Sequence, residues 1–112
     1  VSKCMTTDIG YYFNMDQIKA DPWNSPEKMW QHSPLKYANM AKTPTLFIQS
    51  DEDYRCWMGD AIQMFSALKY FGVEARMCLF HGENHELSRS GKPKHRIRRM
   101  TEMMEWFEKY LK

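Results

Sequence analysis

The sequence has no long hydrophobic run. Its 112 residues include no apolar stretch near the roughly 20 residues that a membrane-spanning helix needs, and no amino-terminal signal sequence is visible. The composition, 43% hydrophobic and 27% charged, is ordinary for one globular domain and argues against disorder. We therefore expect a soluble, cytoplasmic protein that makes no contact with a membrane.

Cysteine is scarce, and the charges of the two signs nearly balance. Cys4, Cys56 and Cys78 are an odd set without C-x-x-C spacing, which argues against a disulfide framework and a zinc knuckle. A net charge of +2 is too small to favour nucleic acid. The basic cluster at 92–99 is typical of the solvated face of a helix, so we expect no nucleic-acid partner.

The most apolar run of the chain leads into its densest acidic cluster. Thr45 to Ile48 is too short for a helix, is rich in β-branched and aromatic side chains, and follows Pro44. This pattern is typical of a strand buried on both faces. Asp51, Glu52 and Asp53 follow it. Loops at the carboxyl ends of parallel strands collect binding and catalytic residues, so these acids are candidate functional groups.

A second stretch repeats this arrangement. Glu74 to Phe80 has the pattern of another strand and leads into His81 to Glu86. If the two strands are parallel neighbours, an acid and an imidazole meet at one edge of the sheet. An Asp hydrogen-bonded to one ring nitrogen fixes the tautomer and orientation of a His that acts as general base. The sequence thus predicts two members of a catalytic triad.

Helical spacing predicts how these strands are connected and covered. Met58 to Phe71 reads as a crossover helix that ends at Gly72, so residues 45–80 form a right-handed βαβ unit and the fold class is α/β. A terminal amphipathic helix is expected to begin between Pro93 and Arg96. It would cover one sheet face with five apolar side chains: Ile97, Met100, Met104, Phe107 and Leu111.

Two strands and a piece of a third are fewer than the about four to six of a typical sheet. Ten Met, four Trp, six Tyr and six Phe are a heavy apolar load for this length. The chain is therefore expected to dock on more protein, or to cover its exposed sheet edge by homo-oligomerisation or a domain swap.

Five segments occur in an order and spacing that are found together in one family. They are Ser33-Pro34-Leu35, Thr43-Pro44-Thr45-Leu46, Asp53-Tyr54-Arg55, Gly82-Glu83-Asn84-His85-Glu86 and Arg89-Ser90-Gly91-Lys92-Pro93-Lys94-His95-Arg96. Together they resemble the carboxyl-terminal part of the prolyl oligopeptidase family, in the acylaminoacyl-peptidase-like branch of the α/β-hydrolase serine peptidases. The resemblance covers almost the whole chain. It implies a partial α/β-hydrolase fold, with residues 1–112 as the carboxyl-terminal portion of a catalytic domain.

The resemblance also assigns roles to individual residues. It makes Asp53 the triad acid and His85 the general base, in the hydrolase order of serine, acid, histidine. Asp51 or Glu52 is the alternative acid, and a solvated acidic loop needs no function at all. Arg55 resembles the arginine that binds a substrate backbone carbonyl, a role that suits its fork of donors. The alternative is that Arg55 pairs with Glu52 or Asp51.

Two places depart from the pattern of the family. Cys56 and Trp57 stand where a valine and a proline usually follow the Asp-Tyr-Arg element, and Gln49 and Ser50 stand where the family often has His-Gly. These changes flank the acid without removing it. They bear on the shape of the pocket more than on the chemistry.

The nucleophile is missing. No G-x-S-x-G elbow is present to expose a serine hydroxyl, and no cysteine has such an elbow. In the family the elbow serine and the oxyanion donors would lie upstream of Val1. We therefore expect a serine-type peptidase fragment in which the nucleophile-bearing half is absent and which is inactive alone. Its partners would be a peptide substrate and the missing amino-terminal part of the catalytic domain.

Aromatic side chains are candidates for the substrate pocket. Tyr12 and Phe13 lie in an aromatic cluster near the amino end, and Trp23 lies in a turn before a short helix. Ordinary packing is the alternative for the aromatic cluster. Ser25 is the expected N-cap of that short helix, with Pro26 at its first position.

The two histidines of the second loop do not predict a metal site. His81 and His85 are four residues apart, as metal ligands on a helix are, but Gly82 after a strand argues against a helix there. We expect neither metal nor cofactor.

Two alternatives remain for the function. The rival from another class is a non-catalytic interaction module with a hydrolase-like fold. An esterase or other acyl hydrolase also stays open, because an acid–base pair serves acyl transfer in general.

Overall fold

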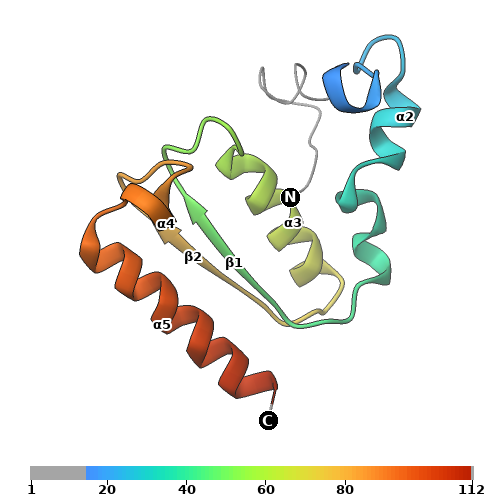
Figure 1. The fold of residues 1–112 in the computed structure, drawn as a ribbon. Helices are drawn as coiled ribbons and strands as arrows, with labels where there is room; N and C mark the ends of the chain where they lie inside the picture. Colours follow the sequence, from blue (N-terminus) through green and yellow to red (C-terminus); the bar gives the residue numbers. More distant parts are fainter. Residues whose placement is uncertain (1–14, 112) are drawn as a thin grey trace.

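The structure, a computed structural model, describes residues 15–111. The elements follow in the order α2 (Pro26–Gln31), the 3₁₀ segment η1 (Pro34–Met40), β1 (Thr45–Ser50), α3 (Met58–Tyr70), β2 (Ala75–Phe80), α4 (Leu87–Ser90) and α5 (Pro93–Tyr110). Figure 1 shows α3 and α5 on opposite sides of the two strands, with α2 beyond α3. None of the described helices is long and apolar enough to cross a membrane.

The two strands are parallel neighbours in full register. Thr45 pairs with Ala75 at one end and Ser50 with Phe80 at the other. The crossover helix α3 joins them, so the predicted parallel unit is confirmed. Gly72, with φ of 75°, supplies the left-handed turn that ends α3. Because the strands end together, the loops after them begin side by side.

The core lies between α3, η1 and the sheet. Leu68 of α3 is 1% exposed and packs with Ala38, Val73 and Ala75. Phe65 of α3 meets Phe47 of β1 edge to face, with ring centroids 6.0 Å apart. Side chains at odd positions of the strands thus face α3, which fixes α3 against the sheet.

The opposite face of the sheet meets α5 through polar contacts. Glu102 is 3% exposed and accepts hydrogen bonds from Arg76 of β2 at 2.9 Å and from Arg98 of α5 at 2.6 and 2.8 Å. His95 packs its ring edge to face against Phe80. The helix therefore covers the sheet as predicted, but a buried carboxylate and two guanidinium groups form the centre of the contact.

The predicted apolar stripe of α5 is on the other side of the helix. Its five residues are between 47% and 75% exposed, so the expectation that they cover the sheet is wrong: Ile97, Met100, Met104, Phe107 and Leu111. The inward face instead holds Glu102 with its ion pairs to Arg76 and Arg98.

Two further expectations need correction. Only Ser50 of β1 is buried, because within residues 15–111 the sheet has two strands and no strand pairs with the second edge of β1. Ser25 precedes α2 at the N-cap position but makes no side-chain cap. Its Oγ instead accepts a hydrogen bond from the Asp21 N–H at 3.0 Å, within the turn before the helix.

Candidate catalytic acid and base

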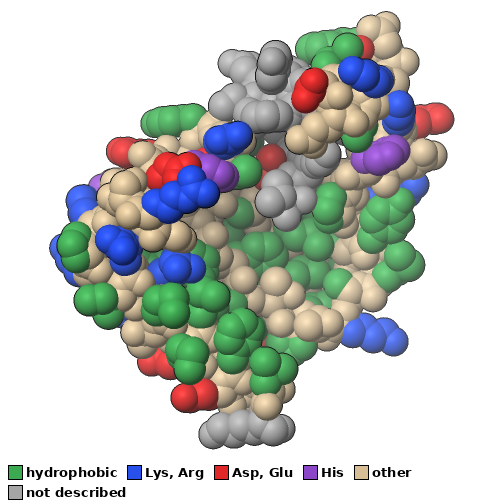
Figure 2. Space-filling view, viewed as in Figure 1, with side chains coloured by type: hydrophobic (Ala, Val, Ile, Leu, Met, Phe, Trp, Pro, Cys, Tyr) green, Lys and Arg blue, Asp and Glu red, His purple; other side chains and the backbone are tan. Residues whose placement is uncertain are grey.

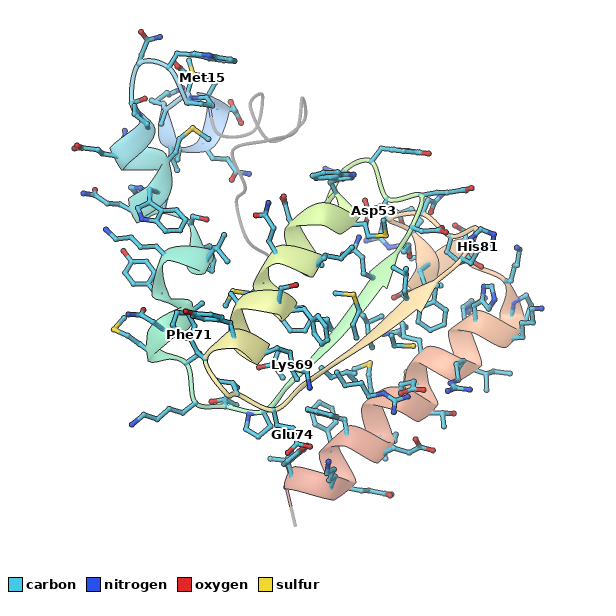
Figure 3. The ribbon with its side chains drawn as sticks, turned by 180° about the vertical axis from the view of Figure 1, so that it is seen from behind. Met15, Asp53, Lys69, Phe71, Glu74 and His81 are labelled. Atoms are coloured by element: carbon cyan, nitrogen blue, oxygen red, sulfur yellow. The ribbon has the colours of Figure 1, made fainter. Side chains whose placement is uncertain are left out.

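Backbone hydrogen bonds hold together the two loops that follow the strands. The Asp51 N–H donates to the Phe80 carbonyl at 3.1 Å, which continues the strand pairing by one residue. The Glu52 N–H then donates to the Glu83 carbonyl at 3.0 Å. In return, the Gly82 N–H donates to Oδ1 of Asp51 at 2.8 Å. The acidic loop and the histidine loop are therefore fixed relative to each other, and Figure 3 shows Asp53 and His81 at the same end of the strands.

Asp53 is a buried carboxylate with each oxygen in a separate contact. The residue is 7% exposed. Its Oδ1 accepts the N–H groups of Arg55 at 3.0 Å and Cys56 at 2.8 Å. Its Oδ2 faces Nδ1 of His85 at 3.0 Å. Two backbone donors thus fix the rotation of the carboxylate and leave one oxygen for the imidazole.

His85 is oriented by this contact. Because an ionised carboxylate only accepts, Nδ1 donates the proton, and the neutral ring carries its free lone pair on Nε2. Among the described residues, none forms a hydrogen bond with Nε2 of His85. The side chain is 41% exposed, so the basic nitrogen is open to a reacting group, as a general base requires.

The same two loops hold a second acid–imidazole pair. Oδ2 of Asp51 lies 2.5 Å from Nδ1 of His81. The hydrogen bond from His81 and that from the Gly82 N–H hold the pKa of Asp51 below its ordinary value. However, the side chain of His81 is 95% exposed. Water screens this pair, so it is a weaker candidate for positioning a base than Asp53 with His85.

Glu83 connects the histidine loop to α5. The residue is buried, and its Oε1 accepts the Lys92 N–H at 2.9 Å and Nδ1 of His95 at 2.6 Å. Both hydrogen bonds lower the pKa of Glu83, and the one from the Lys92 N–H has the larger effect. Since its carbonyl also receives the Glu52 N–H, Glu83 is in contact with both loops and with the start of α5. Lys92 and His95 therefore attach the histidine loop to the last helix.

The other candidate site residues are distributed unevenly. Arg55 is exposed on the loop of Asp53, with its backbone N–H on that carboxylate. Trp23 is 74% exposed and lies in the turn before α2, and Figure 1 shows α2 beyond α3 from the two loops. The structure therefore does not bring Trp23 to the acid and base. Tyr12 and Phe13 lie outside the described residues.

The described thiols are unsuited to act as nucleophiles. Burial raises the pKa of Cys56 above its ordinary value, and the charge of Asp53 adds to the effect. Burial likewise raises the pKa of Cys78. A thiol with a raised pKa holds little thiolate at neutral pH. Residues 15–111 also contain no group of three or more His, Cys, Asp or Glu side chains that could hold a metal ion.

The sequence does not single out two features of this site. It offers Asp51 only as an alternative acid and does not predict its pairing with His81, although both follow a strand in the same way. It offers Glu83 only as part of a motif, without a structural role. Its partner His95 lies twelve residues further on, a separation that no short motif signals.

The parallel strands, the crossover helix and the acid–imidazole pair at their carboxyl ends define part of an α/β-hydrolase fold. The family model of the prolyl oligopeptidase family matches residues 1–112. The chain belongs to the prolyl oligopeptidase family.

Individual relatives agree with this assignment. The chain is 41% identical over 105 residues to the uncharacterized peptidase YuxL of Bacillus subtilis, a match that covers 94% of this chain and 16% of that protein. It is 31% identical to dipeptidyl-peptidase 5 of Schizosaccharomyces pombe, over 90% of this chain and 14% of that protein. The chain thus spans about a sixth of the curated relatives it matches.

Solved structures show the same fold. The acylaminoacyl peptidase of Pyrococcus horikoshii matches with a TM-score of 0.84 and 37% identity, over 91% of this chain and 17% of that one. An acylaminoacyl peptidase in complex with Z-Gly-Gly-Phe-chloromethyl ketone matches equally well, with a TM-score of 0.84.

Proposed function

We propose that this chain supplies the acid and the base of a serine peptidase of the acylaminoacyl- or oligopeptidase-like kind. The observation that carries the proposal is the buried Asp53 carboxylate, held by two backbone N–H groups and facing Nδ1 of His85. Membership of the prolyl oligopeptidase family and the peptide-derived ligand of a solved relative support a peptide as the substrate.

The chemistry follows from the orientation of His85. Nε2 takes the proton from a serine hydroxyl as its oxygen forms a bond to the scissile carbonyl carbon. The imidazolium then gives this proton to the leaving amine as the C–N bond breaks, and a water molecule later releases the acyl group by the same route. Asp53 stabilises the cation and keeps the proton on Nδ1. Arg55, on the same loop, would bind a carbonyl oxygen of the substrate.

The serine comes from protein outside these residues. The edge of β1 with which no strand among residues 15–111 pairs would receive it, because a further parallel strand can pair there. Beside that edge lies a groove of about 460 Å³, lined in part by Leu46, Ile48, Trp57 and Met64. In this proposal the nucleophile-bearing half of the catalytic domain packs on the groove and the edge together, and the chain is inactive without it.

Matched variants of the two acids test the assignment in the full-length protein. Asp53→Asn should lower turnover of a peptide substrate by about 10⁴-fold, because the imidazole then takes the wrong tautomer. Asp51→Asn, which alters the exposed pair, should leave turnover within a few-fold of wild type. Near-normal turnover of Asp53→Asn, or an equal loss in Asp51→Asn, would contradict the proposal.

Complementation separates the peptidase from the interaction module. When the upstream part of the protein is supplied as a second polypeptide, hydrolysis should appear and should be lost with His85→Ala. An interaction module predicts that the two polypeptides bind without hydrolysis and that His85→Ala changes nothing.

A further inference from the structure

The turn that carries Asp53 lies in a polar part of the molecule. Figure 2 shows acidic, basic and histidine side chains gathered at the end where the two strands of Figure 1 finish. Within the turn, Tyr54 and Arg55 are exposed. Exposed side chains contribute little packing, so the hydrogen bonds of the turn decide where the Asp53 carboxylate lies.

Gln49, the residue before the last of β1, holds the far end of this turn. Its Nε2 donates to the Cys56 carbonyl at 2.8 Å and to the Ser50 carbonyl at 3.2 Å. Carbonyl oxygens only accept, so both contacts require the nitrogen of the amide and fix its orientation. The hydrogen bond to Cys56 closes the loop between the end of β1 and the start of α3.

Cys56 passes this constraint to Asp53. The Cys56 N–H donates to Oδ1 of Asp53 at 2.8 Å, while the Cys56 carbonyl accepts from Gln49. Both backbone polar groups of Cys56 are thus engaged. Without the contact from Gln49, the backbone of Cys56 can rotate, and an N–H group that fixes the Asp53 carboxylate moves with it.

The sheet and α3 are the fixed points on either side of the turn. Gln49 pairs with Leu79 in the register of β1 and β2, and β2 leads into the loop of His85. The amide therefore ties the acid to the same pair of strands from which the base departs. A Cβ on Gly59 would collide with the indole ring of Trp57, so this ring lies against the first turn of α3. Loss of the Gln49 contact should thus displace the turn and leave the helix in place.

We propose that Gln49 is a positioning residue of the peptidase, an inference that rests on the proposed function. It acts through the Cys56 carbonyl and keeps Oδ2 of Asp53 opposite Nδ1 of His85. Gln49 is a position at which the sequence departs from the family pattern, so the resemblance assigns it no role.

Steady-state kinetics of the full-length protein on a peptide p-nitroanilide tests this role. Gln49→Met keeps the length of the side chain without an N–H donor. It should lower kcat about 10- to 100-fold while KM stays within about twofold. Gln49→His, whose ring N–H can reach the same carbonyl, should restore kcat to within a few-fold of wild type.

Thr45→Val is the matched control for these variants. The Thr45 hydroxyl donates to the Thr43 carbonyl at 2.8 Å, a side-chain hydrogen bond to the backbone at the opposite end of β1. Its removal should leave kcat unchanged. Melting temperatures show whether Gln49→Met folds. If it melts below the assay temperature, Gln49→Glu takes its place, because a carboxylate has a similar length and likewise lacks a donor.

A double-mutant cycle with Asp53→Asn separates positioning from a general structural effect. If Gln49 acts through Asp53, Gln49→Met should lower kcat by less than about twofold further once Asp53 is replaced. A merely structural role predicts that the whole loss is repeated in that background.

Four results would overturn the inference. They are a near-normal kcat of Gln49→Met, an equal loss in Thr45→Val, a Gln49→His variant as slow as Gln49→Met, and a loss repeated in full in the Asp53→Asn background. Near-normal turnover of Asp53→Asn would instead overturn the proposed function itself.

Discussion

Oε1 of Glu83 lies 2.6 Å from Nδ1 of His95, and this contact joins the loop that carries His85 to helix α5. Glu83 is two residues before His85, and its carbonyl also receives the Glu52 N–H. The position of the proposed general base thus depends on a helix that does not reach the catalytic groups. Glu83 is a positioning residue in this account, since it acts only through the loop.

We expect Glu83→Gln to lower kcat while KM changes little. The amide cannot serve both the Lys92 N–H and His95 as a carboxylate does, so the loop loosens and His85 moves away from its working geometry. A misplacement of about 1 Å can cost about 10²-fold in rate. Steady-state kinetics of the full-length protein measures the effect. Glu86→Gln is the control, because the Glu86 side chain is 41% exposed and, among residues 15–111, its carboxylate forms an ion pair with Arg89 alone. Equal losses in both variants would argue against the positioning role.

The stability that Glu102 contributes should disappear in acid. Hydrogen bonds from Arg98, and the charges of Arg98 and Arg76, hold the pKa of Glu102 below its ordinary value. A carboxyl group with a lowered pKa stabilises the fold fully above the unfolded value of about 4.3, and that contribution is lost as the pH falls through the folded-state pKa. Melting temperatures of wild type and Glu102→Gln should therefore differ at pH 7 and converge towards pH 3. A constant difference would contradict this.

Alanine should destabilise the protein at two glycines, for different reasons and to different degrees. A Cβ on Gly91 would lie 2.5 Å from the Leu87 carbonyl and 2.9 Å from Oε2 of Glu83, so Gly91→Ala should displace Glu83 and lower both stability and turnover. Gly72 has open space around it but a φ of 75°. Gly72→Ala should thus cost only the strain of a left-handed residue, about 1–2 kcal/mol, and leave turnover intact. Thermal melts and kinetics of both variants distinguish steric displacement from backbone strain.

Cys56 should react slowly with iodoacetamide at neutral pH. Its pKa is raised by burial, and only the thiolate is alkylated. Mass spectrometry measures the rate of Cys56 alkylation in the protein and in a short peptide with the sequence of residues 54–58. Alkylation in the protein should be slower than in the peptide and should accelerate once the protein is unfolded in urea. Labelling of Cys56 as fast as in the peptide would show that the loop around Asp53 is open in solution.

The sequence was sufficient to predict the parallel unit and the meeting of acid and base. Short apolar runs at 45–48 and 74–80, with a helical pattern ending at Gly72 between them, permit few other arrangements. The structure places both strand ends within two residues of the prediction. The pattern does not decide which acid faces which histidine, because Asp51 and Asp53 follow the same strand. Only the family resemblance favours Asp53.

The orientation of α5 could not be predicted from periodicity. A 3.6-residue pattern shows that one face is apolar, and the usual inference turns that face inward. Here Arg76, at an even position of β2, points to the helix and pairs with Glu102. Such a pairing joins residues 26 positions apart, which no local pattern reveals. The pairing of Glu83 with His95 is likewise invisible to a local sequence pattern, because the two residues are twelve positions apart.

The full register of β1 and β2 has a consequence for how this segment can vary in length among natural relatives. The turn through Gly72 at the amino end of β2 makes no contact with the acid or the base, so insertions there leave the catalytic geometry unchanged. Between Ser50 and Asp53, one added residue would lengthen the turn that holds the carboxylate, and Asp53 would lose its position opposite Nδ1 of His85. Homologous genes should therefore accumulate insertions and deletions at the first place and almost none at the second.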